Sequence, residues 1–218
     1  VQAPSFRVDI TREVDLMEEV ARLEGYDRIP VTSPPVRPAE EKDPVLLTLG
    51  DRVREIMAGV GFSEVISFSF VGPESVEKLG ARAGSDLRAF VELMNPLTGE
   101  QSVMRTTLVP GLLSTVKTNH FHGEKDLRLF EWGRVFVSRG REELPWERTC
   151  VCAVMTGLSG RKEWYAEERA ADFYDIKGAL EGLLEALGVR GLQFRRPEAP
   201  PPGYHRECCA GVSVSDSI

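Results

Sequence analysis

The sequence predicts an α+β protein, in which a small helix-and-strand unit precedes a larger domain of strands flanked by helices. Apolar residues recur at helical spacing over 11–24, 46–60 and 173–187. Strand-like patterns, alternating or continuously apolar, cover 6–10, 65–71, 127–136 and 149–158. A proline-rich stretch over 25–44, which forbids regular structure, separates the first helix from the second. We therefore expect one domain over 1–36 and another over 37–218.

The first unit is predicted to start with a short, half-buried strand, because apolar and polar residues alternate over 6–10. A helix over 11–24 follows, capped by Thr11 or Asp9 and ended by Gly25. At 100° per residue, its apolar residues fill one half of the helix and its charged residues the other.

Four carboxylates gather at the start of this helix: Asp9, Asp15, Glu18 and Glu19. Like charges at such spacings repel by about 0.2–0.5 kcal/mol per pair in an exposed helix. A hard divalent cation reverses that sign, and oxygen ligands favour magnesium or calcium. Acidic residues in a first turn also suit the helix dipole, and a charged face is commonly just solvated. Spacing alone leaves both interpretations open.

The second domain is predicted to begin with an amphipathic helix, capped by Asp43 and with Pro44 in its first turn. Its apolar stripe suits a core and a subunit interface equally well, and consists of Leu46, Leu49, Val53, Ile56, Met57 and Val60. A strand over 65–71, a short helix over 73–80 and a turn over 84–86 follow.

The stretch from Val91 to Phe136 is predicted to form a strand, a turn, a helix and a second strand. The first strand is closed by the turn dipeptide Asn95-Pro96. Pro110 suits the first turn of the helix, where a missing N–H is not needed. The second strand starts at Leu127. A polar hairpin loop over 138–146 then leads to the strand over 149–158.

The last part of the chain is predicted to hold a helix and an edge strand. Asp172 caps the helix and Gly188 ends it. The edge strand covers 192–194, and a proline-rich loop follows over 197–203. We expect this chain to be a piece of a longer polypeptide, because it starts inside a predicted strand and has no closing element at Ser217-Ile218.

Composition excludes several classes of protein. The net charge of −7 argues against nucleic-acid binding through a broad basic face, and we expect no DNA partner. No apolar stretch approaches the ~20 residues of a membrane span, and no signal-peptide pattern is present, so we expect no membrane association. The four cysteines lack CxxC spacing and are expected to be reduced, packed thiols in a cytoplasmic protein: Cys150, Cys152, Cys208 and Cys209.

Two local motifs invite functional interpretations. His120 and His122 form an HxH pair, but no third ligand stands at useful spacing, so a solvated pair is favoured over a metal site. The cations of Gly160-Arg161-Lys162 precede Trp164 and Tyr165, a combination that also occurs in RNA-binding loops. We expect a mobile loop with a docked tryptophan there instead.

Three phrases of the chain resemble the phenylalanine-tRNA ligase β subunits of bacteria. The phrases that resemble the core of that family are MNPLTGEQSVMRTTLVPGLL and, after it, LFEWGRVF. The phrase that resembles the family's next segment is FYDIKGALEGLLEALGV. The small domain before that core is similar at its end to RVDITREVDLMEEVARLEGYDRIP. The resemblance implies a class II aminoacyl-tRNA synthetase-like antiparallel sheet flanked by helices. The helix over 46–60 and its strand are similar to the first signature element of that class, which builds a subunit interface.

The resemblance also implies function. The family is non-catalytic in this region, pairs with a catalytic α subunit in an α2β2 heterotetramer, and shares a Mg²⁺ ion with it. The ligands of that ion match Asp9, Asp15, Glu18 and Glu19 here. The whole enzyme is a ligase that joins phenylalanine to tRNA using ATP; we expect ATP and tRNA to be bound by the whole enzyme and this piece alone to be inactive.

One departure supports that expectation. In catalytic class II enzymes an arginine follows the aromatic residue of the second signature strand, where it neutralises the ATP α-phosphate, and an acid stands two positions later. Val137 and Arg139 take those positions here. Arg134 remains, Arg105 is expected to be a structural hydrogen-bonding residue, and the family's PGRSA-like phrase is only partly followed over 202–206. The alternatives are an autonomous adenylate-forming enzyme and a tRNA-binding module.

Overall fold

The computed structural model describes residues 2–33, 35, 45–140, 143–160, 164–165 and 168–214. Contacts between Cα atoms divide the chain into two compact units, Val1–Lys42 and Asp43–Ile218. The domain boundary expected at residue 36 and the predicted cap at Asp43-Pro44 lie outside the described residues, so both stay predictions. Each unit is described by itself.

The first unit contains one α-helix, α1 (Glu13–Glu24), followed by a 3-10 turn, η1 (Tyr26–Arg28). Gly25 ends α1 with φ of 93°, a backbone conformation that glycine adopts without strain. The predicted cap is wrong, because the N-cap residue is Arg12. The carboxylate of Asp15 instead accepts hydrogen bonds from the backbone N–H groups just before the helix.

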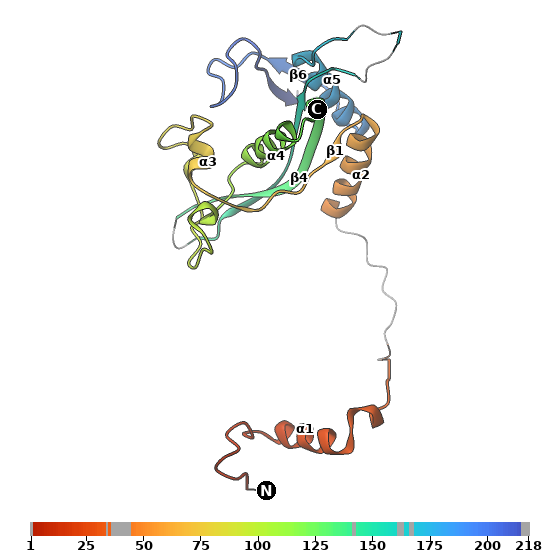
Figure 1. Cartoon of the computed structure of the whole chain (residues 1–218), viewed down its shortest axis with the longest axis vertical. Helices are drawn as coiled ribbons and strands as arrows, with labels where there is room; N and C mark the ends of the chain where they lie inside the picture. Colours follow the sequence, from red (N-terminus) through yellow and green to blue (C-terminus); the bar gives the residue numbers. More distant parts are fainter. Residues whose placement is uncertain are drawn as a thin grey trace. The chain divides into compact units, whose positions relative to one another are not determined.

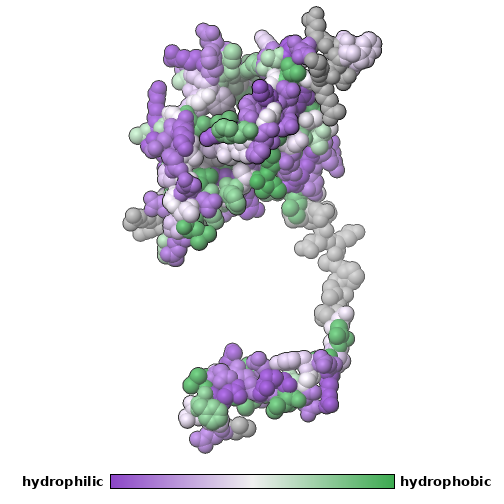
Figure 2. Space-filling model, in the orientation of Figure 1, coloured by the Kyte–Doolittle hydropathy of each residue, from purple (hydrophilic) through white to green (hydrophobic). Residues whose placement is uncertain are grey.

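The strand predicted over 6–10 is also wrong. These residues form turns, with Arg7 N–H donating to the Pro4 carbonyl at 3.0 Å. Phe6 and Val8 are 79% and 83% exposed, and the described residues of this unit include no second strand with which a ladder could form. A strand needs a neighbouring strand to pair with its backbone N–H and C=O groups, so the alternation of apolar and polar residues alone did not produce a strand here. The apolar side of α1 is exposed as well (Figure 2).

The second unit is built on a three-stranded sheet of order β1-β4-β5. The short β1 (Ser63–Glu64) runs parallel to β4 (Leu127–Val137), and β4 pairs antiparallel with β5 (Trp146–Thr156) along its whole length (Figure 1). The strands predicted at 127–136 and 149–158 are thereby confirmed and form a hairpin, but its loop is shorter than the predicted 138–146, because Trp146 already pairs with Val137. Strand β4 continues to Val137, whereas β5 starts earlier than predicted, at Trp146, and ends earlier, at Thr156.

Helices cover the two faces of this sheet. On one face α2 (Val45–Gly59) and α5 (Phe173–Ala186) bury Val53, Met57 and Leu183 against Phe130. On the other face α4 (Val109–Phe121) buries Leu112 against Leu127 and Leu129 (Figure 1). Successive residues of β4 therefore serve opposite cores, which follows from the two-residue period of a strand.

The strand predicted over 65–71 is interrupted. Beyond β1 the chain leaves the ladder and resumes only at β2 (Phe70–Val71), which pairs antiparallel with β3 (Val103–Met104). The physical reason is a side chain: Glu131 accepts hydrogen bonds from Ser67 N–H at 3.3 Å and from Ser67 Oγ at 2.6 Å. The strand expected at Val91 is likewise reduced to a single bridge between Glu92 and Val103.

Short helices and a second ladder complete the unit. The short helices are α3 (Glu74–Glu77), η2 (Asp86–Arg88) and η3 (Gly99–Gln101). As predicted, Asp172 caps α5, and its carboxylate accepts from Tyr174 N–H at 2.8 Å. The predicted edge strand is β6 (Leu192–Arg195), which pairs antiparallel with β7 (Gly211–Val214) in a separate two-stranded sheet.

Candidate functional site

The acidic segment of the first unit is organised by an arginine that sequence reasoning did not single out. Arg7 donates to both carboxylate oxygens of Asp9, from Nε at 3.0 Å and from Nη2 at 2.7 Å. The same Nη2 also lies 2.7 Å from Oε1 of Glu19. The other oxygen of Glu19 accepts from Arg22 at 2.7 Å. One guanidinium group therefore joins the turn before α1 to the middle of the helix.

The remaining two acids behave differently. The Oδ2 atom of Asp15 accepts from the backbone N–H groups of Thr11 and Arg12 at 2.9 and 2.7 Å, which satisfies donors at the helix start. Its Oδ1 atom lies 3.5 Å from the Arg12 guanidinium. Glu18 lies exposed on the helix surface. Of the four predicted metal ligands, two are held by Arg7, one caps the helix and one faces solvent.

These contacts set the charge state of the acids. Hydrogen bonds from Arg7 lower the pKa of Asp9 and of Glu19 to about 2, with Arg22 adding to the effect at Glu19. Backbone hydrogen bonds from Thr11 and Arg12 lower the pKa of Asp15. All three carboxylates are thus ionised at neutral pH, but they are already engaged with donors of this chain.

As they lie, the four carboxylates do not fit a metal ion. No three His, Cys, Asp or Glu side chains converge on one point anywhere in the part of the chain that the structure describes. The ligand set predicted from the resemblance is present in sequence, but its oxygens point toward guanidinium and backbone donors. Sequence analysis missed Arg7. Its position two residues before Asp9 could have indicated an ion pair between these two side chains.

In the second unit, the centre of the sheet holds a buried ion pair. Arg105 and Glu131 are 6% and 2% exposed, and Nη1 of Arg105 lies 2.5 Å from Oε1 of Glu131. Arg105 also donates to the Arg134 carbonyl at 2.8 Å and to Ser67 Oγ at 3.0 Å. The structural hydrogen-bonding role expected of Arg105 is confirmed.

The positions of the second signature strand carry no phosphate-binding arrangement. Val137 ends β4 opposite Trp146 of β5. Arg139, which stands where the acid is expected, pairs with Glu143 at 2.7 Å and lies 5.3 Å from the Trp146 ring. Arg134 pairs with Glu147 at 3.1 Å on the exposed hairpin. An apolar side chain at the key position cannot neutralise a phosphate.

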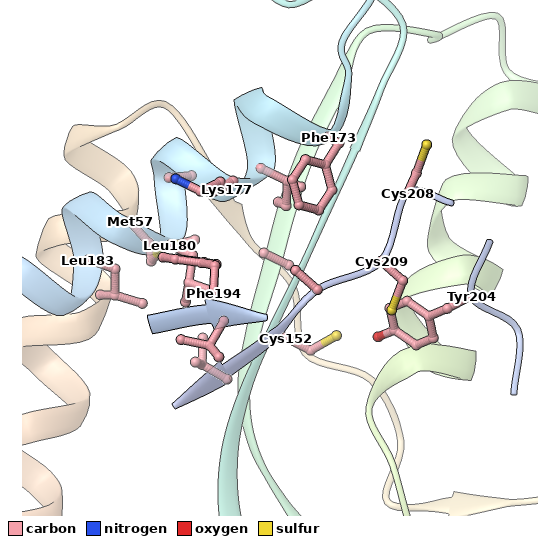
Figure 3. A pocket seen from close by; sticks show the side chains of 16 residues that line it. Met57, Cys152, Phe173, Lys177, Leu180, Leu183, Phe194, Tyr204, Cys208 and Cys209 are labelled. Carbon is pink, nitrogen blue, oxygen red and sulfur yellow. The ribbon is translucent and has the colours of Figure 1, made fainter. Parts of the chain in front are cut away.

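An apolar cavity of about 340 Å³ lies between α5, β5 and the β6–β7 ladder (Figure 3). Among the described residues that line it, one is charged: Lys177, whose Nζ lies 2.5 Å from Glu181 and 4.4 Å from the Phe194 ring centre. Cys152, Cys209 and Tyr204 lie together at one end (Figure 3). The rest of the lining is mostly apolar, as in a core, and the ammonium group of Lys177 is already paired with Glu181. Sequence analysis did not find it, because its walls come from distant segments.

The four cysteines are free thiols. Burial, together with the negative charge of Glu131, raises the pKa of Cys152 to about 11. The expectation of packed thiols is therefore confirmed for Cys152, but it is wrong for Cys208, which is exposed.

The two local motifs are placed as follows. His120 Nε2 lies 3.4 Å from Thr156 Oγ1, whereas His122 Nδ1 lies 2.8 Å from the Thr118 carbonyl, so the rings have separate partners. Trp164 is 95% exposed, and its ring meets that of Tyr165 edge to face at 5.5 Å. The docked tryptophan was therefore a wrong prediction. Arg161 and Lys162 lie outside the described residues. None of the described helices combines the length and apolar character needed to span a bilayer.

The chain has a class II aminoacyl-tRNA synthetase-like fold. It superposes on a pyrrolysyl-tRNA synthetase from Desulfitobacterium hafniense with a TM-score of 0.52 and 21% identity, over 72% of this chain and 50% of that one. A histidine–tRNA ligase subunit from Alicyclobacillus acidocaldarius gives a TM-score of 0.52 and 19% identity, over 77% of this chain and 45% of that one. The predicted fold class is confirmed.

Sequence comparison identifies the family. Residues 29–218 match the model of the phenylalanyl-tRNA synthetase beta chain CLM domain, and residues 1–26 match that of the tRNA synthetase B5 domain. The chain belongs to the phenylalanyl-tRNA synthetase beta chain family. It is 43% identical over 199 residues to the phenylalanine–tRNA ligase beta subunit of Syntrophus aciditrophicus, covering 89% of this chain and 24% of that one. That of Geobacter sulfurreducens is 43% identical over 218 residues, covering 100% and 27%. The chain thus spans about a quarter of the length of these curated relatives.

Proposed function

We propose that this chain is a non-catalytic assembly region of a phenylalanine–tRNA ligase beta subunit, which pairs with a catalytic α subunit. The observation that carries the proposal is Val137, an apolar residue at the position where the catalytic members of the class bind the ATP α-phosphate. The cations nearest to it along the hairpin, Arg134 and Arg139, are in ion pairs with Glu147 and Glu143. Adenylate formation then belongs to the α subunit.

The pairing surface that we propose is the start of α2. The second half of this helix is core, because Val53 and Met57 are each 2% exposed. Near its start, Leu46 of the apolar stripe is 54% exposed and its neighbour Leu47 is 61% exposed, so the helix begins with apolar side chains in solvent. A helix with apolar residues buried along its middle and exposed at its start supports both of the roles that the sequence left open.

The experiment is size-exclusion chromatography of the chain mixed with the α subunit. A complex is expected with the native chain and is lost with Leu46→Glu/Leu47→Glu. Tyr174→Glu, which changes an exposed side chain at the start of α5, leaves it intact. Separate elution of the native chain and the α subunit at tens of micromolar contradicts pairing through this region.

In the whole α2β2 enzyme, the proposed reaction is ATP-dependent joining of phenylalanine to its tRNA in the cytoplasm. We assign Asp9, Asp15, Glu18 and Glu19 to a Mg²⁺ site shared with the α subunit, on the strength of the family resemblance. In the present arrangement these side chains do not converge, because Arg7 holds Asp9 and Glu19 while Asp15 accepts from the backbone at the helix start. When bound, such an ion would offset the negative charge of these carboxylates.

Two alternatives have their own tests. An autonomous adenylate-forming enzyme catalyses phenylalanine-dependent pyrophosphate exchange without the α subunit, which Val137 argues against. A tRNA-binding module gives submicromolar tRNA affinity that falls steeply with salt, which the net charge of −7 argues against.

A further inference from the structure

We infer that Cys152 and Cys209 form a redox-active dithiol, which hydrogen peroxide converts into a disulfide between strand β5 and the segment before β7. The two cysteines lie at one end of the apolar cavity of the second unit, beside Tyr204 (Figure 3). Both are free thiols in the described structure. The described lining of this cavity includes Met57 of α2 but not the start of that helix, so the dithiol is separate from the proposed pairing surface.

The two sulfur atoms lie near the same hydroxyl group. Cys152, Cys209 and Tyr204 all line the cavity, and the sulfur atoms of both cysteines lie on the side of Tyr204 (Figure 3). Burial raises the pKa of the Tyr204 hydroxyl, and the charges of Cys152 and Cys209 raise it further. Charges shift a pKa in this way at short range, so both thiols lie close to that hydroxyl and therefore close to each other.

The other two cysteines are placed differently. Cys208 is exposed, and its sulfur atom points away from Tyr204 (Figure 3). Cys150 lies two residues before Cys152 on β5, where Cα atoms are about 6.5–7 Å apart, at the upper end of the range that a disulfide spans. The fold therefore brings together one cysteine from each end of the second unit's sequence, Cys152 and Cys209, rather than two neighbours in the chain.

The first step of the reaction belongs to Cys209. Burial, followed by the charge of Glu131, raises the pKa of Cys152 to about 11, so its thiolate is scarce at neutral pH. The partly exposed Cys209 is then the thiol that attacks hydrogen peroxide. Its sulfur bonds to one oxygen, the O–O bond breaks, and the leaving hydroxide takes up the proton that the thiol lost. The products are one water molecule and a sulfenic acid at Cys209.

The second step joins the two cysteines. The sulfur of Cys152 attacks the sulfur of the Cys209 sulfenic acid, so that the S–S bond forms as the S–O bond breaks. The leaving hydroxide takes the proton of the Cys152 thiol and becomes the second water molecule. Two thiols are thereby oxidised by two electrons in total, and one peroxide is reduced to two waters. A small thiol reverses the reaction by thiol–disulfide exchange.

The disulfide connects two sheets that are otherwise separate. In the part of the chain that the structure describes, β5 belongs to the three-stranded sheet, and β6 and β7 form a ladder of their own. Cys209 stands two residues before Gly211, where β7 begins. The new bond therefore ties the β6–β7 ladder to β5 across one end of the cavity.

The test is oxidation of the full chain with hydrogen peroxide near neutral pH, followed by mass spectrometry of peptides prepared without reduction. Cys152→Ser and Cys209→Ser each remove one member of the dithiol. Cys150→Ser and Cys208→Ser are the matched controls, since each removes a thiol that stands beside one of these two in the sequence. Circular dichroism checks that all the chains fold alike before peroxide is added.

We expect a peptide that joins Cys152 to Cys209 in the native chain and in both control variants, and dithiothreitol restores the two thiols. In Cys152→Ser the reaction stops at the Cys209 sulfenic acid, which dimedone traps. In Cys209→Ser the oxidation of Cys152 slows about tenfold or more, because little thiolate is present. A native chain that keeps both thiols, or a disulfide formed instead through Cys150 or Cys208, overturns the inference. Neither result bears on pairing with the α subunit.

Discussion

Arg105 and Glu131 form an ion pair with 2.5 Å between Nη1 and Oε1 at the centre of the second unit, with almost no exposure of either side chain. Glu131 also accepts from Ser67, and Arg105 donates to the Arg134 carbonyl. The pair thus ties the segment after β1, the segment after β3 and strand β4 into one network. Such a pair is costly to break from one side, because the partner is left as a buried, uncompensated charge.

Glu131→Gln is expected to destabilise the second unit by about 3–5 kcal/mol, since it leaves the Arg105 charge buried without its counterion. The measurement is the free energy of unfolding in urea. Glu147→Gln breaks the exposed pair with Arg134 and serves as the control, with an expected loss of at most about 1 kcal/mol. Equal losses of unfolding free energy in the two variants would show that the buried pair contributes no more to stability than the exposed one.

Two glycine-to-alanine substitutions are expected to change the stability of the second unit in opposite directions. A Cβ atom at Gly133 would collide with Nη2 of Arg105, so Gly133→Ala displaces the buried pair and destabilises the unit. Gly178 lies on the exposed side of α5 with nothing near its Cβ position, so Gly178→Ala stabilises by about 0.5–1 kcal/mol through helix propensity. Thermal unfolding of both variants checks this, and destabilisation by both would contradict the assigned environments.

The start of α5 is expected to lose stability in acid. Hydrogen bonds from Arg169, followed by that from Asp172 N–H, lower the pKa of Asp175 to about 2 from its ordinary 3.8. Because the folded-state pKa is the lower one, this contribution is fully present above pH 3.8 and is lost as pH falls toward about 2. Urea midpoints of the native chain and of Asp175→Asn, measured between pH 2 and 5, should therefore converge toward low pH; a constant gap would contradict this origin.

Thiol reactivity is expected to rank the cysteines by exposure. Burial raises the pKa of Cys152 to about 11, which leaves very little thiolate at pH 8, whereas Cys208 is exposed. Iodoacetamide labelling followed by mass spectrometry of peptides should modify Cys208 first and Cys152 last. In denaturant the two should react alike, and fast labelling of native Cys152 would show that its strand opens.

The sequence by itself determined the helices and strands that depend on interactions between residues close together in the chain. Alternation and apolar runs located the β4–β5 hairpin, helical spacing located α2, α4 and α5, and Asp172 was identified as a cap from its place before an apolar stripe. The match of whole sequence segments indicated the family and the fold class, because such segments carry specific residue identities that physical patterns alone do not specify. The same local reasoning failed at 6–10, where alternation was present but no partner strand was.

The tertiary structure decided what depends on meetings between distant residues. Ser67 and Glu131 are 64 positions apart, and their contact interrupts a strand that the pattern predicted as continuous. Arg7 and Glu19 are 12 positions apart, and their contact turns a predicted ligand set into an occupied ion-pair network. A periodic pattern records which way a side chain faces, but a hydrogen bond needs a donor and an acceptor within about 3 Å, and only the folded chain brings them together.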